Sequence, residues 1–245
     1  MTHFTYLFVN FFTVIVPLLF TFHPKLNFYK TWWAFSPAII LTGLCFVIWD
    51  NWFTRLGVWG FNYQYLTGVT IGKLPVEELL FFICIPYACM FTFHCLTTLV
   101  SWKVNTKIQD VVMWLLVVGL IIAGLVFFER IYTSVTFLSQ AVLLLAARYW
   151  LKVSWLGKFY IIYGFLLLPF LLVNGILTGM GLERPVVWYN SAEIIGLRLL
   201  TIPFEDVFYG MELILLNLLI YLHLLNRKAA TEKQSPTATV IKPMI

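Results

Sequence analysis

The sequence is short of charge. Only 11% of its 245 residues are Asp, Glu, Lys or Arg, and 61% are hydrophobic. Soluble domains carry about 25% charged residues, so a water-soluble fold is excluded and an integral membrane protein is indicated. The formal net charge of +5 does not predict nucleic-acid binding, because the basic residues are scattered over short loops.

Metal-binding and cofactor-binding patterns are also scarce. The four histidines are too scattered to form the His boxes of membrane di-iron enzymes. The four cysteines all lie within apolar runs without C-x-x-C spacing, so we expect them to pack in the protein rather than to form a disulfide framework or a thiolate metal site. No G-x-G-x-x-G occurs, which excludes a dinucleotide-binding fold. The sequence therefore predicts no metal site and no cofactor.

Long apolar segments are present instead. Stretches of about 20 residues, the length that crosses a bilayer, lie near 4–22, 34–53, 75–100, 110–128, 131–151, 158–178 and 202–225. The first has no basic n-region and no A-x-A-like cleavage site, so we interpret it as a retained spanning helix. The polar stretch 226–245 is expected to be a disordered tail.

The basic residues of the loops predict the orientation. Five of the 16 Lys and Arg residues fall on the side that holds the N-terminus, and eleven fall on the other side. Since cytoplasmic loops carry the excess of Lys and Arg, we expect the N-terminus outside and the C-terminus in the cytoplasm. The expected location is a cell membrane, crossed several times.

Two related stretches reveal an internal repeat. FNYQYLTGVTIGKLPVEELLF and YNSAEIIGLRLLTIPFEDVFY align without a gap at a shift of 128 residues. The matched positions are Asn62 with Asn190, Gly68 with Gly196, Pro75 with Pro203, Glu77 with Glu205, and Glu78 with Asp206. The pattern predicts an all-α membrane protein with two parallel three-helix repeats, 1–100 and 129–225, joined by a linker helix in 101–128. A site is expected between the halves.

The repeated acid pairs are the main candidates for chemistry. Proline followed by acids is a common helix start, because acids in the first turn complement the helix dipole. Adjacent helical residues point about 100° apart, so one acid of each pair can cap while the other faces the bundle. We expect the four carboxyl groups to meet in an interior pocket. Crowded carboxyl groups in an apolar pocket cannot all ionise, so one remains a general acid.

Aromatic residues near the acid pairs suit a cationic intermediate. Ring faces attract a cation without offering a nucleophile, and Trp59 and Trp188 precede the two pairs. Membrane interfaces also enrich Trp and Tyr, so an interfacial role for any single ring stays open.

The P-x-E-[ED] signatures, with GVWGFN and VVWYN before them, resemble the membrane-type lycopene cyclase family in its fused single-chain form. The resemblance covers roughly 1–225. It implies an intramolecular lyase or isomerase that converts the ψ-end of lycopene, or of a related acyclic carotenoid, to a β-ionone ring without net redox change. It also implies that the catalytic acids are Glu77, Glu78, Glu205 and Asp206. The expected partners are this substrate and the lipid bilayer, and the sequence leaves open a homo-oligomer or association with other carotenoid enzymes.

Further polar residues are candidates for substrate binding. Asp50 ends the second apolar segment, where the helix dipole disfavours an anion, which favours either a site role or an interfacial hydrogen bond. Asn62 and Asn190 are the repeated Asn residues. Arg198 precedes the second acid pair, where it could neutralise an acid or contact a lipid headgroup.

Two other functions fit seven helices. A proton-coupled small-molecule transporter with a 3-1-3 helix layout is the main alternative, although clustered acids suit proton chemistry better than sugar binding. A retinal-binding protein needs a Schiff-base lysine in its last helix, and 202–225 contains none.

Overall fold

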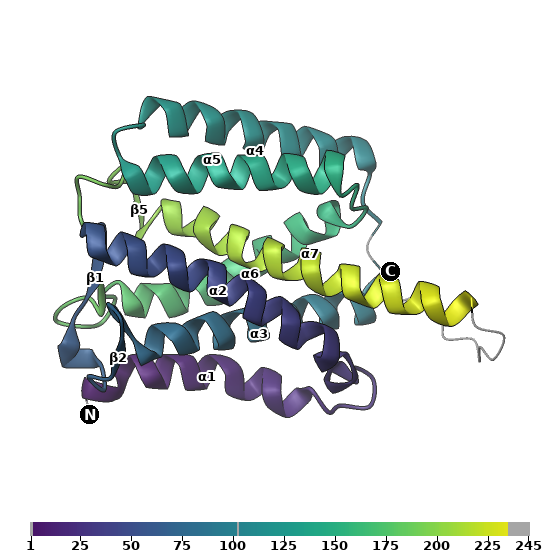
Figure 1. The fold of residues 1–245 in the computed structure, drawn as a ribbon, viewed down its shortest axis with the longest axis horizontal. Helices are drawn as coiled ribbons and strands as arrows, with labels where there is room; N and C mark the ends of the chain where they lie inside the picture. Colours follow the sequence, from purple (N-terminus) through teal and green to yellow (C-terminus); the bar gives the residue numbers. More distant parts are fainter. Residues whose placement is uncertain (1, 102, 235–245) are drawn as a thin grey trace.

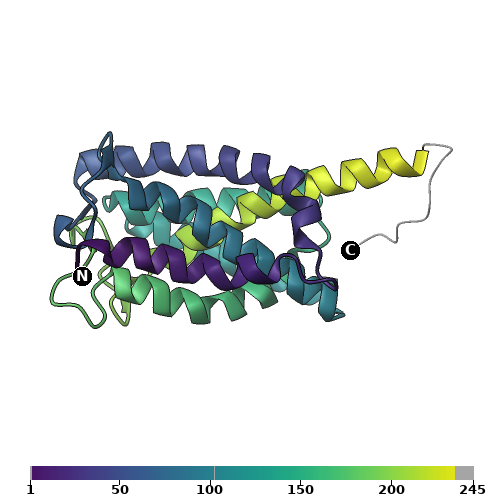
Figure 2. The same cartoon turned by 90° about the horizontal axis from the view of Figure 1, so that it is seen from below.

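The chain forms a bundle of long helices with short strands gathered at one end (Figures 1 and 2). The computed structural model describes residues 2–101 and 103–234. Its α-helices are α1 (Thr5–Phe20), α2 (Trp32–Leu56), α3 (Val76–Leu99), α4 (Thr106–Val126), α5 (Ile131–Leu145), α6 (Leu156–Leu177) and α7 (Glu205–Gln234). Shorter helical turns are η1 (Thr2–Phe4), η2 (Phe28–Thr31), η3 (Tyr63–Tyr65) and the π-helical continuation of α5, η4 (Ala146–Trp150).

Within the described residues, six helical segments are long and apolar enough to cross a membrane: Phe28–Leu56, Val76–Leu99, Thr106–Val126, Ile131–Trp150, Leu156–Leu177 and Glu205–Glu232. The prediction of a mostly helical, integral membrane protein is therefore confirmed. The remaining helix, α1, is apolar but has only 16 residues. At 1.5 Å per residue it covers about 24 Å, less than the roughly 30 Å hydrocarbon core. The expected span 4–22 is thus shorter in the structure, and the exact seven-span layout stays a prediction.

The second difference from expectation concerns the C-terminal segment. Helix α7 continues to Gln234, so 226–234 is helical rather than disordered. Long helix-forming side chains such as Arg227, Lys228 and Glu232 favour this extension, and Lys228 and Glu232 form an i,i+4 ion pair. The rest of the expected tail lies outside the described residues.

The short strands join the two halves of the chain. β1 (Trp59–Phe61) pairs antiparallel with β4 (Val187–Tyr189), and each strand lies 128 residues from the other. The pairing continues symmetrically, because Asn62 N–H donates to Val186 O and Asn190 N–H donates to Val58 O, both at 2.8 Å. Gly60 is required here, since a Cβ at this position would lie 2.4 Å from the Trp188 ring.

Each half also builds a hairpin before its acid pair. β2 (Thr70–Ile71) pairs with β3 (Leu74–Pro75), and β5 (Arg198–Leu199) pairs with β6 (Ile202–Pro203). Gly68 and Gly196 precede these hairpins with φ angles of +87° and +89°, a left-handed conformation that favours glycine. The hairpins lead directly into α3 and α7, so both acid pairs enter the bundle from the same end.

Helix packing follows the repeat. α1 packs along α3 and α5 packs along α7, while α2 packs against both α3 and α7. α4 lies on the outer side of α5 (Figure 1). Buried apolar side chains from α2, α3, α5, α6 and α7 form one continuous core.

Candidate active site

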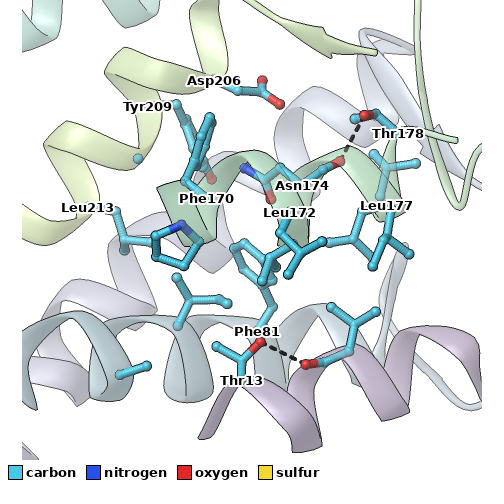
Figure 3. A pocket seen from close by; sticks show the side chains of 18 of the residues that line it. Thr13, Phe81, Phe170, Leu172, Asn174, Leu177, Thr178, Asp206, Tyr209 and Leu213 are labelled. Atoms are coloured by element: carbon cyan, nitrogen blue, oxygen red, sulfur yellow. Dashed lines mark hydrogen bonds between the residues drawn. The ribbon is translucent and has the colours of Figure 1, made fainter. Parts of the chain in front are cut away.

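A cavity of about 650 Å³ lies among α1, α3, α6 and α7, beneath the β1–β4 pair. Its walls are mostly apolar. Figure 3 shows Asp206 and Tyr209 of α7, Asn174 and Leu172 of α6, and Thr13 of α1 around this space. Three carboxyl groups line it: Asp50, Glu78 and Asp206. All three are buried, which is costly in an apolar medium unless each carboxyl group is protonated or hydrogen-bonded.

Asp206 is held by two phenol groups. Tyr132 OH donates to its Oδ1 at 2.6 Å, and Tyr189 OH donates to its Oδ2 at 2.9 Å. Tyr132 comes from α5 and Tyr189 from β4, so the two donors reach Asp206 from different elements. Hydrogen bonds donated to both oxygens favour the ionised carboxylate.

Asp50 and Glu78 form a pair of a different kind. Tyr6 OH donates to Glu78 Oε2 at 2.7 Å, and Tyr209 OH donates to Asp50 Oδ1 at 2.5 Å. The two carboxyl groups lie close enough to interact with one another. Two neighbouring carboxyl groups in an apolar cavity do not readily ionise together, because burial and like charge both disfavour the second negative charge. Burial and proximity thus disfavour ionisation of both Asp50 and Glu78 together, while the two phenol hydrogen bonds offset part of the cost of ionising Asp206.

Glu77 and Glu205 do not line the cavity. Glu77 Oε1 accepts from Thr67 N–H at 2.7 Å. Glu205 Oε1 accepts from Ile195 N–H at 2.6 Å and from the Thr133 hydroxyl at 2.6 Å. The two glutamates thus clamp the loop that precedes their own hairpin, in equivalent ways. Of the four acids expected to meet in the pocket, only Glu78 and Asp206 line the cavity, and Asp50 supplies its third carboxyl group. The first acid of each pair points away from the cavity because neighbouring helical residues diverge by about 100°.

Trp59 is the central aromatic residue of the site. Its ring is buried, lines the cavity, and meets the rings of Tyr132 and Tyr189 at centroid distances of 5.0 and 6.1 Å. Tyr209 lies 6.2 Å away. The hydroxyl group of each of these tyrosines donates a hydrogen bond to a carboxyl group. The rings therefore surround the acids, while the phenol oxygens are hydrogen-bonded to them.

The other sequence-predicted binding residues lie outside the cavity lining. Asn62 and Asn190 accept turn hydrogen bonds, each at 3.1 Å, from Gln64 N–H and Ala192 N–H. Trp188 is exposed and covers Gly60. Arg198 donates to Thr201 O within its hairpin. These contacts account for the positions as turn and strand residues, and a binding role for them stays untested.

The four tyrosine donors are the residues that sequence reasoning missed. Tyr6 and Tyr132 start α1 and α5 and serve Glu78 and Asp206 in the same way, but they lie 126 residues apart rather than 128, outside the gapless alignment. Tyr189 belongs to the VVWYN stretch, where nothing in the sequence marks it as the partner of an acid. Burial raises the pKa of Tyr189 well above its usual value, and the nearby Asp206 charge raises it further. Its phenol therefore remains a donor through neutral and mildly alkaline pH.

Comparison with protein families decides the affiliation. Residues 3–96 and 129–224 match the lycopene cyclase family model. The chain belongs to the lycopene cyclase family. No curated protein and no solved structure matches the chain. The two matched segments correspond to the two halves that α4 separates, and a lycopene cyclase is an enzyme of carotenoid cyclisation that acts in a lipid environment. The transporter alternative is not favoured.

The clamp at Glu205 predicts a stability effect. Glu205→Ala should lower the free energy of unfolding by about 2–4 kcal/mol, because it removes the acceptor of two hydrogen bonds and each unpaired buried donor costs about 1–3 kcal/mol. Glu205→Gln should restore most of it, since the amide oxygen still accepts. The measurement is thermal unfolding in detergent, with the exposed Glu183→Ala as control. Equal effects of Glu205→Ala and Glu183→Ala would contradict the clamp.

Proposed function

We propose that the chain is a lycopene cyclase that forms β-ionone rings by proton-initiated, redox-neutral cyclisation of the ψ-ends of lycopene. The observation that supports this most is the pairing of unlike carboxyl groups in one apolar cavity. Asp50 and Glu78 lie beside one another, which supports a proton shared between them, and Asp206 accepts two phenol hydrogen bonds. Such a contrast assigns an acid and a base within one site.

In the proposed reaction, the Asp50–Glu78 pair donates its proton to the terminal double bond of the ψ-end. A C–H bond forms and leaves a tertiary carbocation. The neighbouring double bond attacks this cation, which closes the six-membered ring and moves the positive charge to a second tertiary carbon. Loss of the adjacent ring proton to Asp206 restores a double bond. One proton enters and one leaves, so no oxidant or reductant is consumed.

The surroundings of the carboxyl groups suit the cation. The Trp59 ring can stabilise positive charge without reacting with it, and the ionised Asp206 adds a counter-charge in a medium that screens little. Tyr132, Tyr189 and Tyr209 present ring carbons, while their oxygens are bound to carboxyl groups. The proton that Asp206 receives returns to the Asp50–Glu78 pair before the next turnover.

Tyr189→Phe tests the support given to Asp206. We expect kcat to fall about tenfold or more, because a hydrogen bond to a charged group is worth roughly 1.5–3 kcal/mol and 1.4 kcal/mol is a factor of ten. Thermal stability should change little, since the ring and its contacts remain. The measurement is the rate of ring formation by purified enzyme in lipid. Tyr63→Phe, on an exposed tyrosine, is the control, and equal rates for the two variants would count against the assignment.

The function itself is tested by expression in a host that accumulates lycopene, with the extracted pigments separated by chromatography. We expect cyclised carotenoids from this chain alone, because both halves are present in it. A host that keeps only lycopene, despite verified membrane insertion of the protein, would refute the proposal. We also propose an external N-terminus and a cytoplasmic C-terminus, from the distribution of basic residues, and reporter fusions at the C-terminus test this orientation.

A further inference from the structure

The cavity is elongated and runs from the carboxyl groups along the helices, and we call this elongated space the limb. On α3 its lining residues are Glu78, Phe81, Ile85, Ala88, Cys89 and Thr92, which form one helical face. Fourteen residues separate Glu78 from Thr92, and at 1.5 Å per residue this is about 21 Å. The limb is thus shorter than the roughly 30 Å hydrocarbon core, and all of its carboxyl groups are near one end.

One side of the limb is open between α1 and α6. These helices lie next to each other (Figure 2) but touch only sparsely, whereas α1 packs closely on α3. Lining residues on both sides of the gap are exposed, with Phe12 of α1 at 67% and Leu172 of α6 at 59%. Both helices are apolar along their length, so the gap faces the hydrocarbon of the bilayer and suits an apolar ligand.

The pseudo-equivalent limb of the other half is filled. Gly210 and Asn174 line the open limb, and a shift of 128 places Phe82 and Phe46 at the corresponding positions. The rings of Phe82 and Phe46 are buried and meet at a centroid distance of 5.9 Å. In the part of the chain that the structure describes, the two halves therefore provide one substrate limb, because aromatic rings fill the equivalent place.

The proposed acid pair, Asp50 and Glu78, also has no equivalent pair in the other half. Asp50 and Tyr209, which hydrogen-bond to one another, correspond to Thr178 and Phe81 at the same shift. Thr178 has no ionisable proton to donate, and Phe81 has no hydroxyl group. The Tyr209–Asp50 contact beside Glu78 thus has no equivalent beside Asp206, so the cavity has one carboxyl pair that can supply a proton for one ring closure.

We propose that the cavity takes one end of an acyclic carotenoid at a time, through the gap between α1 and α6, and that each binding event forms one ring. The inference rests on the proposed function. The rest of the substrate lies in the gap and the surrounding lipid. A cavity of about 650 Å³ is in the range that holds a drug-sized ligand. This volume suits one end of the carotenoid molecule. A second ring requires the molecule to leave and return with its other end.

A time course with purified enzyme in lipid vesicles and lycopene in large excess tests how many rings form in each binding event. We expect the monocyclic carotenoid to accumulate first, with bicyclic product either appearing after a lag that lengthens as the ratio of substrate to enzyme rises or not appearing at all. Bicyclic product from the first turnovers, without a monocyclic transient, would overturn the inference while leaving the proposed function intact. No ring product of either kind would refute both.

Leu172→Trp tests the gap. The larger side chain narrows the opening, so we expect the rate at low lycopene concentration to fall at least fivefold, with less effect on kcat. Leu168→Trp is the matched control, because Leu168 lies on the same helix and is 69% exposed but does not line the cavity. If both variants behave like the parent, or if both lose the same activity, the gap between α1 and α6 is not the route.

Discussion

Glu78→Gln is expected to lower ring formation at least about 100-fold, while the protein stays folded and membrane-inserted. The amide keeps the size of the side chain and still accepts the hydrogen bond from Tyr6, but it cannot share or deliver an acidic proton. General acid catalysis is typically worth 10²–10⁴-fold, so its loss should appear in kcat. The measurement is product formed per mole of folded enzyme.

Glu77→Gln is the matched control for this variant. Glu77 is the neighbouring acid, is fully buried, and accepts from Thr67 N–H without lining the cavity. A glutamine can accept the same bond, so its activity should stay within a few-fold of the parent. The opposite ranking, with Glu77→Gln inactive and Glu78→Gln active, would show that the acid is Glu77 and not Glu78.

Asp206→Asn should also lower ring formation by about 100-fold or more, but for a different reason. Its amide cannot accept the ring proton or carry the counter-charge, and its NH₂ group faces one of the two phenols that now donate to carboxylate oxygens. Glu205→Gln is the control, because Glu205 adjoins Asp206 and serves as a loop clamp.

Solvent deuterium separates the roles of Glu78 and Asp206. In D₂O, the Asp206→Asn enzyme still protonates the substrate, so lycopene recovered from it should carry deuterium after the first cation reverts. Lycopene recovered from Glu78→Gln should carry none. Deuterium in the substrate from Glu78→Gln, with none from Asp206→Asn, would reverse the assignment of acid and base.

The sequence could identify both acid pairs but could not decide which member of each pair faces the cavity. Both members are compatible with a helix start, and their directions depend on where α3 and α7 lie relative to α1 and α5. The choice is made by partners distant in sequence: Tyr6 is 72 residues from Glu78, and Tyr132 is 74 residues from Asp206. No local pattern marks these tyrosines as acid partners, because each begins an apolar helix like many other aromatic residues in the chain.

The repeat was visible in sequence because backbone-special and polar positions recur at one spacing. The differences between the halves were harder to see, since the alignment draws attention to identities, and these differences are replacements such as Asp50 by Thr178 and Gly210 by Phe82. Hydropathy likewise located α1 but not its end. The helix stops at Phe20, and His23 N–H and Leu26 N–H then bond to carbonyl groups three residues back in a turn that contains Pro24.

The β1–β4 pairing also affects assembly. Trp59 and Phe61 come from one half, and Val187 and Tyr189 from the other, yet all four line the cavity from this two-stranded pair. Neither half can close the site alone, because the strand that carries Trp59 pairs with a strand of the second half, and Asp50 of the first half accepts a hydrogen bond from Tyr209 of the second. The cavity is therefore complete only when the two halves have met, and a nascent chain lacks Tyr209 and Asp206 until its last helix is in place.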